Sequence, residues 1–166
     1  MVREHGRGHL LAVDPGNVES AYTLIERPSL RPVEAAKVPN ATMRDVVAIY
    51  QDCADVYIEM IASYGKPVGA TVFETVLEIG RFVECCGGPV SEGGKAHLVY
   101  RREVKLHLCD SSAVTDAIIK QALVDRFAPH ASNHGKGSKA EPSWFYDFKA
   151  DIWQAYALAV YAADQC

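Results

Sequence analysis

Short apolar runs separated by turns predict β-strands in the first part of the chain. The runs cover residues 10–13, 21–25, roughly 33–38 and 56–58. Pro15 and Gly16 turn the chain after the first run, which indicates a hairpin. Thr42 can cap a helix that extends to about Gln51 and precedes the fourth apolar segment. The order β-β-β-α-β predicts a mixed sheet with a helix crossing over it.

Periodic apolar positions predict helices in the rest of the chain. Pro67 can open a helix that reaches about Cys85, and a fifth strand follows at residues 96–100. Another helix starts at Ser111 or Ser112, and residues 129–143 have the composition of a mobile loop. The last helix, 147–164, is apolar nearly all round and should be buried. We expect one α/β domain over residues 1–166, with a five-stranded mixed sheet flanked by helices.

Three carboxylates stand at the ends of these predicted elements. Asp14 follows the first strand, Glu59 ends the fourth, and Asp151 lies near the start of the last helix. If the first and fourth strands are neighbours, Asp14 and Glu59 open at the same edge of the sheet. Acids so close cannot all stay ionised without a cation, and hard oxygen ligands favour Mg²⁺ or Mn²⁺. Asp-Pro-Gly is also a common turn, and Asp147 or Asp151 could simply cap the helix.

Composition and charge narrow the class of protein. The net charge is −4 and the hydrophobic fraction is 49%, so there is no global basic footprint, although a local basic patch could still bind DNA. The 5 cysteines are odd in number and form no CxxC pair, which argues against a zinc site or disulfide framework. The polar N-terminus and the lack of a long apolar run predict a soluble, non-secreted, cytoplasmic protein.

Three motifs in order resemble those of a known family. They are Leu-Ala-Val-Asp-Pro-Gly at residues 11–16, Val-Tyr-Ile-Glu at 56–59, and Ala-Asp-x-x-x-Ala-x-Ala-Leu-Ala at 150–159. Together they resemble the RuvC group of Holliday-junction resolvases, which have the ribonuclease H-like fold. The compact length is typical of a phage or mobile-element version.

The resemblance implies a homodimer that cuts Holliday junctions or other branched DNA with two Mg²⁺ (or Mn²⁺) ions per active site. Asp14 would bridge both ions, Glu59 would bind one, and Asp151 would complete the site. The family often has a further acid one turn after Asp151, where this chain has Gln154. Gln154 offers a neutral oxygen, and Asp147 could compensate for the missing charge.

The resemblance also suggests where DNA would bind. The basic segment after the fifth strand looks like the family's own, and Tyr64 stands where an aromatic could stack on a base. Lysines in the following helix and in the Gly- and Ser-rich loop could contact phosphates. The candidate DNA contacts are Tyr64, Lys66, Arg101, Arg102, Lys105, Lys120, Lys136 and Lys139. Ordinary solvated charges and a packed loop tyrosine are the alternatives.

Two functions other than a nuclease are also compatible with parts of the sequence. A non-catalytic branched-DNA-binding module on the same fold is favoured slightly by Gln154 and by the acidic net charge. A sugar kinase or actin-like ATPase also begins with a strand, an acid and a glycine. Those proteins need two such domains and a second Asp-x-Gly motif, which this chain lacks.

Overall fold

The computed structural model describes residues 8–166. Residues 1–7, part of the polar stretch in which the sequence predicts no signal segment, lie outside the described residues. The strands are β1 (His9–Asp14), β2 (Glu19–Glu26), β3 (Pro32–Pro39), β4 (Ala54–Met60) and β5 (Ala96–Tyr100). The helices are α1 (Asn40–Tyr50), α2 (Ala70–Cys85), α3 (Arg101–Cys109), α4 (Asp116–Phe127), α5 (Ser132–Gly135) and α6 (Ile152–Asp164), with a 3₁₀ turn, η1 (Val90–Glu92).

The strands form one mixed sheet in the order β3-β2-β1-β4-β5. β1 pairs antiparallel with β2 and parallel with β4, and β4 pairs parallel with β5. Helix α1 provides the crossover between β3 and β4. The predicted mixed five-stranded α/β sheet, with the first and fourth strands as neighbours, is therefore confirmed.

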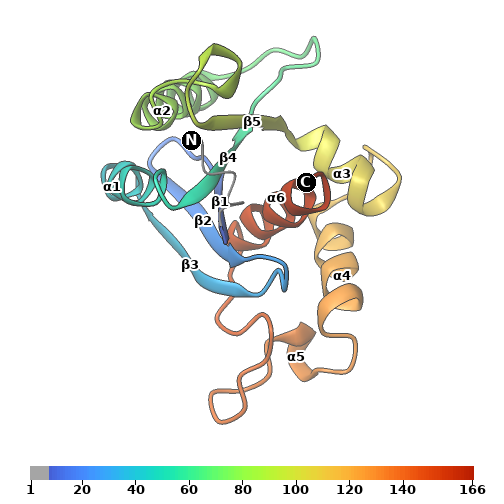
Figure 1. Ribbon diagram of the computed structural model, residues 1–166. Helices are drawn as coiled ribbons and strands as arrows, with labels where there is room; N and C mark the ends of the chain where they lie inside the picture. The colour runs from blue at the N-terminus through green and yellow to red at the C-terminus, as the bar shows by residue number, and fades with distance from the viewer. Residues whose placement is uncertain (1–7) are drawn as a thin grey trace.

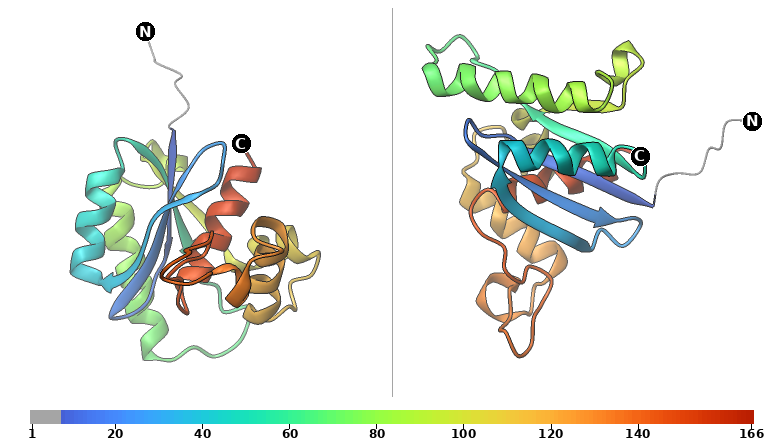
Figure 2. Two further views of the ribbon diagram at one scale, coloured as in Figure 1. Left: turned by 90° about the horizontal axis from the view of Figure 1, so that it is seen from below. Right: turned by 90° about the vertical axis from the view of Figure 1, so that its left-hand side faces the viewer.

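Helices cover both faces of the sheet, which explains the unbroken apolar run of β1. Figures 1 and 2 show α1 and α2 on one face and α6 on the other, with α3 and α4 beside α6. Leu10 and Ala12 pack into the core under α6, whereas Leu11 and Val13 pack into the core under α1 and α2. A strand buried on both faces has no reason to alternate apolar and polar residues.

Helix α6 is buried, as its all-round apolar sequence predicts, but the prediction that it begins near Asp147 is wrong. Asp147 has a positive φ of 60° and the helix starts at Ile152. The rings of Phe145 and Phe148 both pack against Trp153, at 4.6 and 5.2 Å between centroids. Turns in the preceding segment bring these rings into the core, and a helix beginning at Asp147 would not follow that path.

Other element boundaries also differ from the sequence prediction. Helix α2 starts at Ala70 rather than Pro67, and α4 starts at Asp116 rather than at Ser111 or Ser112. The basic segment after β5 is itself helical, because Glu103 accepts a hydrogen bond from the Tyr100 backbone N–H at 2.8 Å and caps α3. The stretch 129–143 includes the short α5 and a bridge between residues 137 and 142. No helix within residues 8–166 is long and apolar enough to span a bilayer.

Candidate active site

Asp14 and Glu59 come from neighbouring parallel strands and lie at the same end of the sheet. Val13 of β1 is in register with Ile58 of β4, so each acid is the next residue along its strand. Strand β4 continues one residue beyond Glu59, to Met60, and Glu59 as a whole residue is only 8% exposed. The parallel register therefore sets two carboxylates side by side at the edge of a buried sheet.

Two further carboxylates complete a cluster that we call the acid pocket, made of Asp14, Glu59, Asp116 and Asp151. Asp14 and Asp151 line one hollow of about 330 Å³, and Asp116 stands at the start of α4. Burial raises the pKa of Asp14 well above its usual value, and the negative charges of Glu59, Asp151 and Asp116 raise it further. The structure therefore brings Asp14, Glu59 and Asp151 into one electrostatic environment.

Two basic side chains enter the acid pocket. Arg101 contacts Glu59 Oε1 through Nη1 at 3.2 Å and Asp116 Oδ1 through Nη2 at 2.7 Å. Lys37 Nζ lies 2.5 Å from Asp151 Oδ2. Burial raises the pKa of Glu59, while the guanidinium of Arg101 opposes that rise. Part of the negative charge of the pocket is thus balanced by the protein itself.

A closed ring of hydrogen bonds fixes the turn that follows Asp14. The Gly16 backbone N–H donates to Ser20 Oγ at 3.1 Å, and the Ser20 hydroxyl donates to Asn40 Oδ1 at 2.7 Å. Asn40 Nδ2 then donates back to the Gly16 carbonyl at 2.9 Å. A Cβ at Gly16 would come 2.2 Å from the Glu19 carbonyl oxygen, so only glycine fits. This ring holds the end of β1, and with it Asp14, in place.

The donor chemistry of the acid pocket fits a hard divalent ion. Carboxylate oxygens are the ligands that Mg²⁺ and Mn²⁺ prefer, and buried acids of like charge gain from a cation between them. Within the described residues, no three His, Cys, Asp or Glu side chains stand close enough together to hold one ion as they are. Glu59 and Asp151 instead pair with Arg101 and Lys37.

Gln154 and Asp147, the two candidates for a further ligand, lie in different places. Gln154 is buried one turn after Asp151 and lines a hollow of about 350 Å³ together with Asp116 and Asp151. Asp147 is exposed, lies 3.5 Å from Lys149 in an ion pair, and lines a separate hollow. The structure therefore brings Gln154, and not Asp147, to the acid pocket.

A basic hollow adjoins the acid pocket. It has a volume of about 590 Å³ and is lined by Tyr64, Lys66, Arg101, Arg102, Lys105 and Ser112. Five of the eight residues suggested as DNA contacts thus share one concave surface. The Tyr64 side chain is 60% exposed, so its ring is open to a partner. Arg101 belongs to both sites, because it lines the hollow and also contacts Glu59.

The three remaining DNA-contact candidates lie on the other side of the acid pocket or beyond it. Lys120 and Lys136 line the hollow that Gln154 and Asp151 share, and Lys120 Nζ stands 5.0 Å from the centre of the Trp153 ring. Lys139 is exposed on the loop after α5. The acid pocket therefore has basic side chains on two sides.

Comparison with known proteins identifies the fold. No protein-family model matches the sequence, and no curated protein matches it either. Among solved structures, Thermus thermophilus RuvC matches with a TM-score of 0.63 and 13% identity, over 93% of both chains. The chain has a RuvC-like fold. A structure of T. thermophilus RuvC in complex with a Holliday junction substrate matches with a TM-score of 0.63 and 12% identity, over 93% of this chain and 92% of that one.

Within this RuvC-like fold, sequence reasoning missed three charged residues of the site. They are Asp116 at the start of α4, Lys37 on edge strand β3, and Lys149, which lines the hollow beside Gln154. Asp116 follows Thr115, an extended residue in the N-cap position of α4. Threonine is a common N-cap residue, so a helix start predicted at Thr115 would have placed Asp116 in the first helical turn. No local signal could have found Lys37, because its contact with Asp151 spans 114 residues of sequence.

Proposed function

We propose that the protein is a metal-dependent endonuclease that cuts Holliday junctions or other branched DNA. The observation that carries this proposal is the acid pocket, where Asp14 and the buried Glu59, from adjacent parallel strands, meet the Asp151 end of α6. The RuvC-like fold supports it, as does the Holliday junction substrate bound to one of the matching structures.

The acid pocket would hold the ions through carboxylate oxygens. Asp14, Glu59 and Asp151 are the proposed ligands for Mg²⁺ or Mn²⁺, with Gln154 as a neutral oxygen ligand, and we expect two ions per site. When bound, such ions activate a water molecule for in-line attack on a phosphodiester and stabilise the leaving oxygen. The ring of Gly16, Ser20 and Asn40 would keep Asp14 oriented toward them.

The basic hollow would receive the DNA next to the acid pocket. Lys66, Arg102 and Lys105 supply positive charge for phosphates, and the exposed ring of Tyr64 offers a surface for base stacking. Lys120, Lys136 and Lys139 would contact the backbone on the other side. A local basic surface of this kind reconciles DNA binding with a net charge of −4.

A homodimer would allow both strands of a junction to be cut. Helix α2 supports this, because Phe73 and Leu77, one turn apart on the same face, are 64% and 57% exposed. An exposed apolar ridge on a helix is typical of a surface that a partner covers, and a second copy of the chain is the partner we propose.

One observation favours a second function, a non-catalytic module that binds branched DNA. Gln154 brings no charge to the acid pocket, and Lys37 and Arg101 already pair with three of its four acids. Such a module would bind junctions and cut nothing with any divalent metal.

A cleavage assay on labelled four-way junctions, forks and flaps, with Mg²⁺ or Mn²⁺, separates these functions. We expect metal-dependent cutting by the wild type and its loss in Asp14→Asn and Glu59→Gln. Asp147→Asn is the matched control, because this exposed acid stands apart from the pocket, and it should cut normally. Cutting that persists in Asp14→Asn would refute the proposed active site, and binding without cutting by the wild type would favour the binding module.

A further inference from the structure

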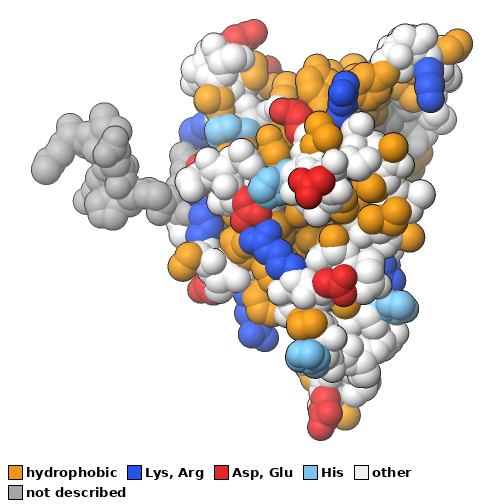
Figure 3. Space-filling model, turned by 90° about the vertical axis from the view of Figure 1, so that its right-hand side faces the viewer, with side chains coloured by type: hydrophobic (Ala, Val, Ile, Leu, Met, Phe, Trp, Pro, Cys, Tyr) orange, Lys and Arg blue, Asp and Glu red, His pale blue; other side chains and the backbone are white. Residues whose placement is uncertain are grey.

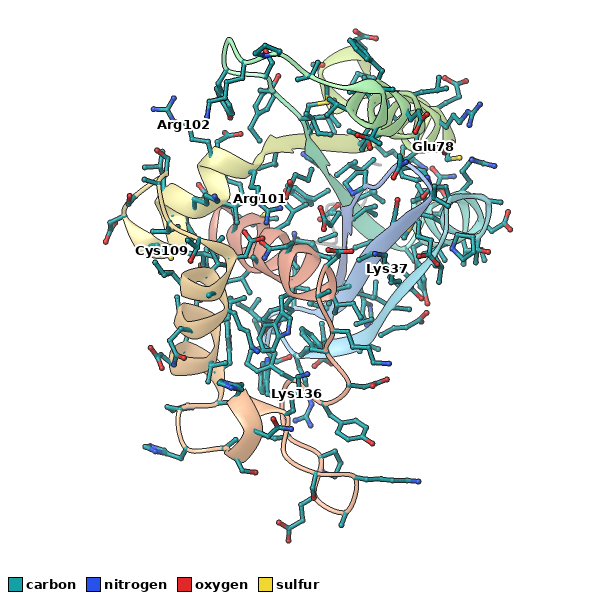
Figure 4. All side chains as sticks on the ribbon, turned by 180° about the vertical axis from the view of Figure 1, so that it is seen from behind. Lys37, Glu78, Arg101, Arg102, Cys109 and Lys136 are labelled. Carbon is teal, nitrogen blue, oxygen red and sulfur yellow. The ribbon has the colours of Figure 1, made fainter. Side chains whose placement is uncertain are left out.

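Arg101 occupies an unusual position for a DNA-contacting arginine. It is the first residue of α3 and follows directly after Tyr100, which is in register with Met60 at the end of β4. This connection sets Arg101 beside Glu59. Figure 4 shows Arg101 near α6 in the middle of the molecule, whereas Arg102 lies on the outside of α3 and points away from it.

The guanidinium of Arg101 bridges two acids from different elements. One nitrogen contacts Glu59 of β4 at 3.2 Å and another contacts Asp116 of α4 at 2.7 Å. The Arg101 side chain is only 30% exposed, and that of Glu59 only 10%. An arginine cannot lose its proton in a protein, so this positive charge is permanent. It stands at Glu59 Oε1, one of the two oxygens that this carboxylate could offer to a divalent ion.

We propose that Arg101 is a built-in counter-ion that competes with a divalent ion for Glu59. This inference rests on the proposed metal-dependent function. The guanidinium pairs with Glu59 and Asp116, and it would move aside when an ion binds Glu59. The basic hollow gives it somewhere to go, because Arg101 already lines that open space of about 590 Å³.

Competition of this kind predicts that removing the positive charge tightens metal binding. Arg101→Gln should bind Mn²⁺ about tenfold more tightly than the wild type, since a nearby positive charge no longer opposes the ion. Arg101→Lys keeps the charge and should stay close to the wild type. Arg102→Gln is the matched control, because it removes the same charge one residue away, outside the acid pocket, and should leave the affinity unchanged.

The affinity can be measured without DNA by titrating the full-length protein with Mn²⁺ and following the electron paramagnetic resonance signal of the free ion. The melting temperature gives a second readout. In EDTA, Arg101→Gln should melt below the wild type because Glu59 loses its partner, and saturating Mn²⁺ should raise its melting temperature by more than that of the wild type.

The outcomes separate the two proposals. Mn²⁺ binding that is equal or weaker in Arg101→Gln than in the wild type would overturn the counter-ion and leave the nuclease assignment standing. Equal tightening in Arg101→Gln and Arg102→Gln would also overturn it, because a general charge effect would then be the cause. Absence of Mn²⁺ binding in every variant, the wild type included, would refute the metal site on which both proposals depend.

Discussion

Removing the Ser20 hydroxyl should weaken both the fold and the position of Asp14. Ser20 is 1% exposed, and its Oγ accepts from the Gly16 N–H and donates to Asn40 Oδ1. Ser20→Ala leaves the Asn40 oxygen buried without this donor, and the partly buried Gly16 N–H loses its acceptor. A buried polar group that loses its partner costs about 1–3 kcal/mol, so the loss should total roughly 2–4 kcal/mol.

Urea denaturation followed by circular dichroism measures this loss, which should lower the melting temperature by about 2–4 °C per kcal/mol. Ser29→Ala is the matched control, because the exposed Ser29 hydroxyl forms hydrogen bonds only with the nearby Glu26 and Arg31. This substitution should change the free energy of unfolding by less than about 0.5 kcal/mol. Combining Ser20→Ala with Asn40→Ala tests the ring itself, since contacting partners show coupling of about 0.5–3 kcal/mol.

The same substitution should reach the proposed metal site through the turn that carries Asp14. Residues that orient a metal ligand typically change metal affinity by about 10–100-fold when they are removed. We expect weaker Mn²⁺ binding by folded Ser20→Ala and unchanged binding by Ser29→Ala. If Ser20→Ala is as stable as the wild type, the ring does not hold this turn. The same conclusion follows if the stability losses of Ser20→Ala and Asn40→Ala simply add in the double variant.

Three further predictions concern other surfaces. Hydrogen bonds from Arg126 and His107 lower the pKa of Asp164 below its usual 3.8. This carboxylate therefore adds stability that is complete above pH 3.8 and is lost as the pH falls through the lowered value. In Asp164→Asn, the free energy of unfolding measured in urea should fall less steeply as the pH is lowered. Replacing Leu77 by Lys should shift the protein from dimer to monomer in light scattering, and an unchanged mass would contradict a dimer through α2. Tyr64→Ala should weaken binding to a four-way junction by about 1–3 kcal/mol while Tyr64→Phe does not, in a fluorescence anisotropy titration.

The surface around Asp164 shows why its charge matters for the fold rather than for DNA. Arg126 Nη1 and Nη2 contact both Asp164 oxygens, at 2.7 and 2.9 Å, and His107 Nε2 lies 2.7 Å from one of them. These contacts join α3, α4 and the end of α6. On the side of the molecule seen in Figure 3, basic, acidic and histidine side chains are interspersed rather than gathered by sign. Such pairing fits helix docking better than a phosphate-binding surface.

The sequence predicts the sheet well because its evidence is local. The unbroken apolar run of β1 reflects burial on both faces, and the helix between β3 and β4 brings β4 parallel to β1. The convergence of Asp14 and Glu59 follows from that register. The start of α6 was missed because the ring of Phe145, which packs on Trp153, decides the path of the chain there. Tertiary packing of this kind leaves no periodic signal.

The sequence predicts the ion-pair partners of the charged residues in the site less well than it predicts the sheet, because those partners come from distant segments of the chain. Arg101 was interpreted as a DNA contact from a basic run, yet its partners are Glu59, 42 residues away, and Asp116. Glu78 shows the same effect on α2, where it is buried and pairs with Arg44 of α1 at 2.8 Å. A sequence pattern predicts which face of a helix is charged, and the neighbouring elements decide which of those charges become buried.

The formal charges of the acid pocket bear on how many ions the proposed metal site would hold. Asp14, Glu59, Asp116 and Asp151 carry four negative charges when ionised, and two positive charges, from Arg101 and Lys37, oppose them. The two negative charges that remain would be balanced by one divalent ion. At the proposed metal site, a second ion would bring excess positive charge unless the basic side chains withdraw or a phosphate enters with its own negative charge.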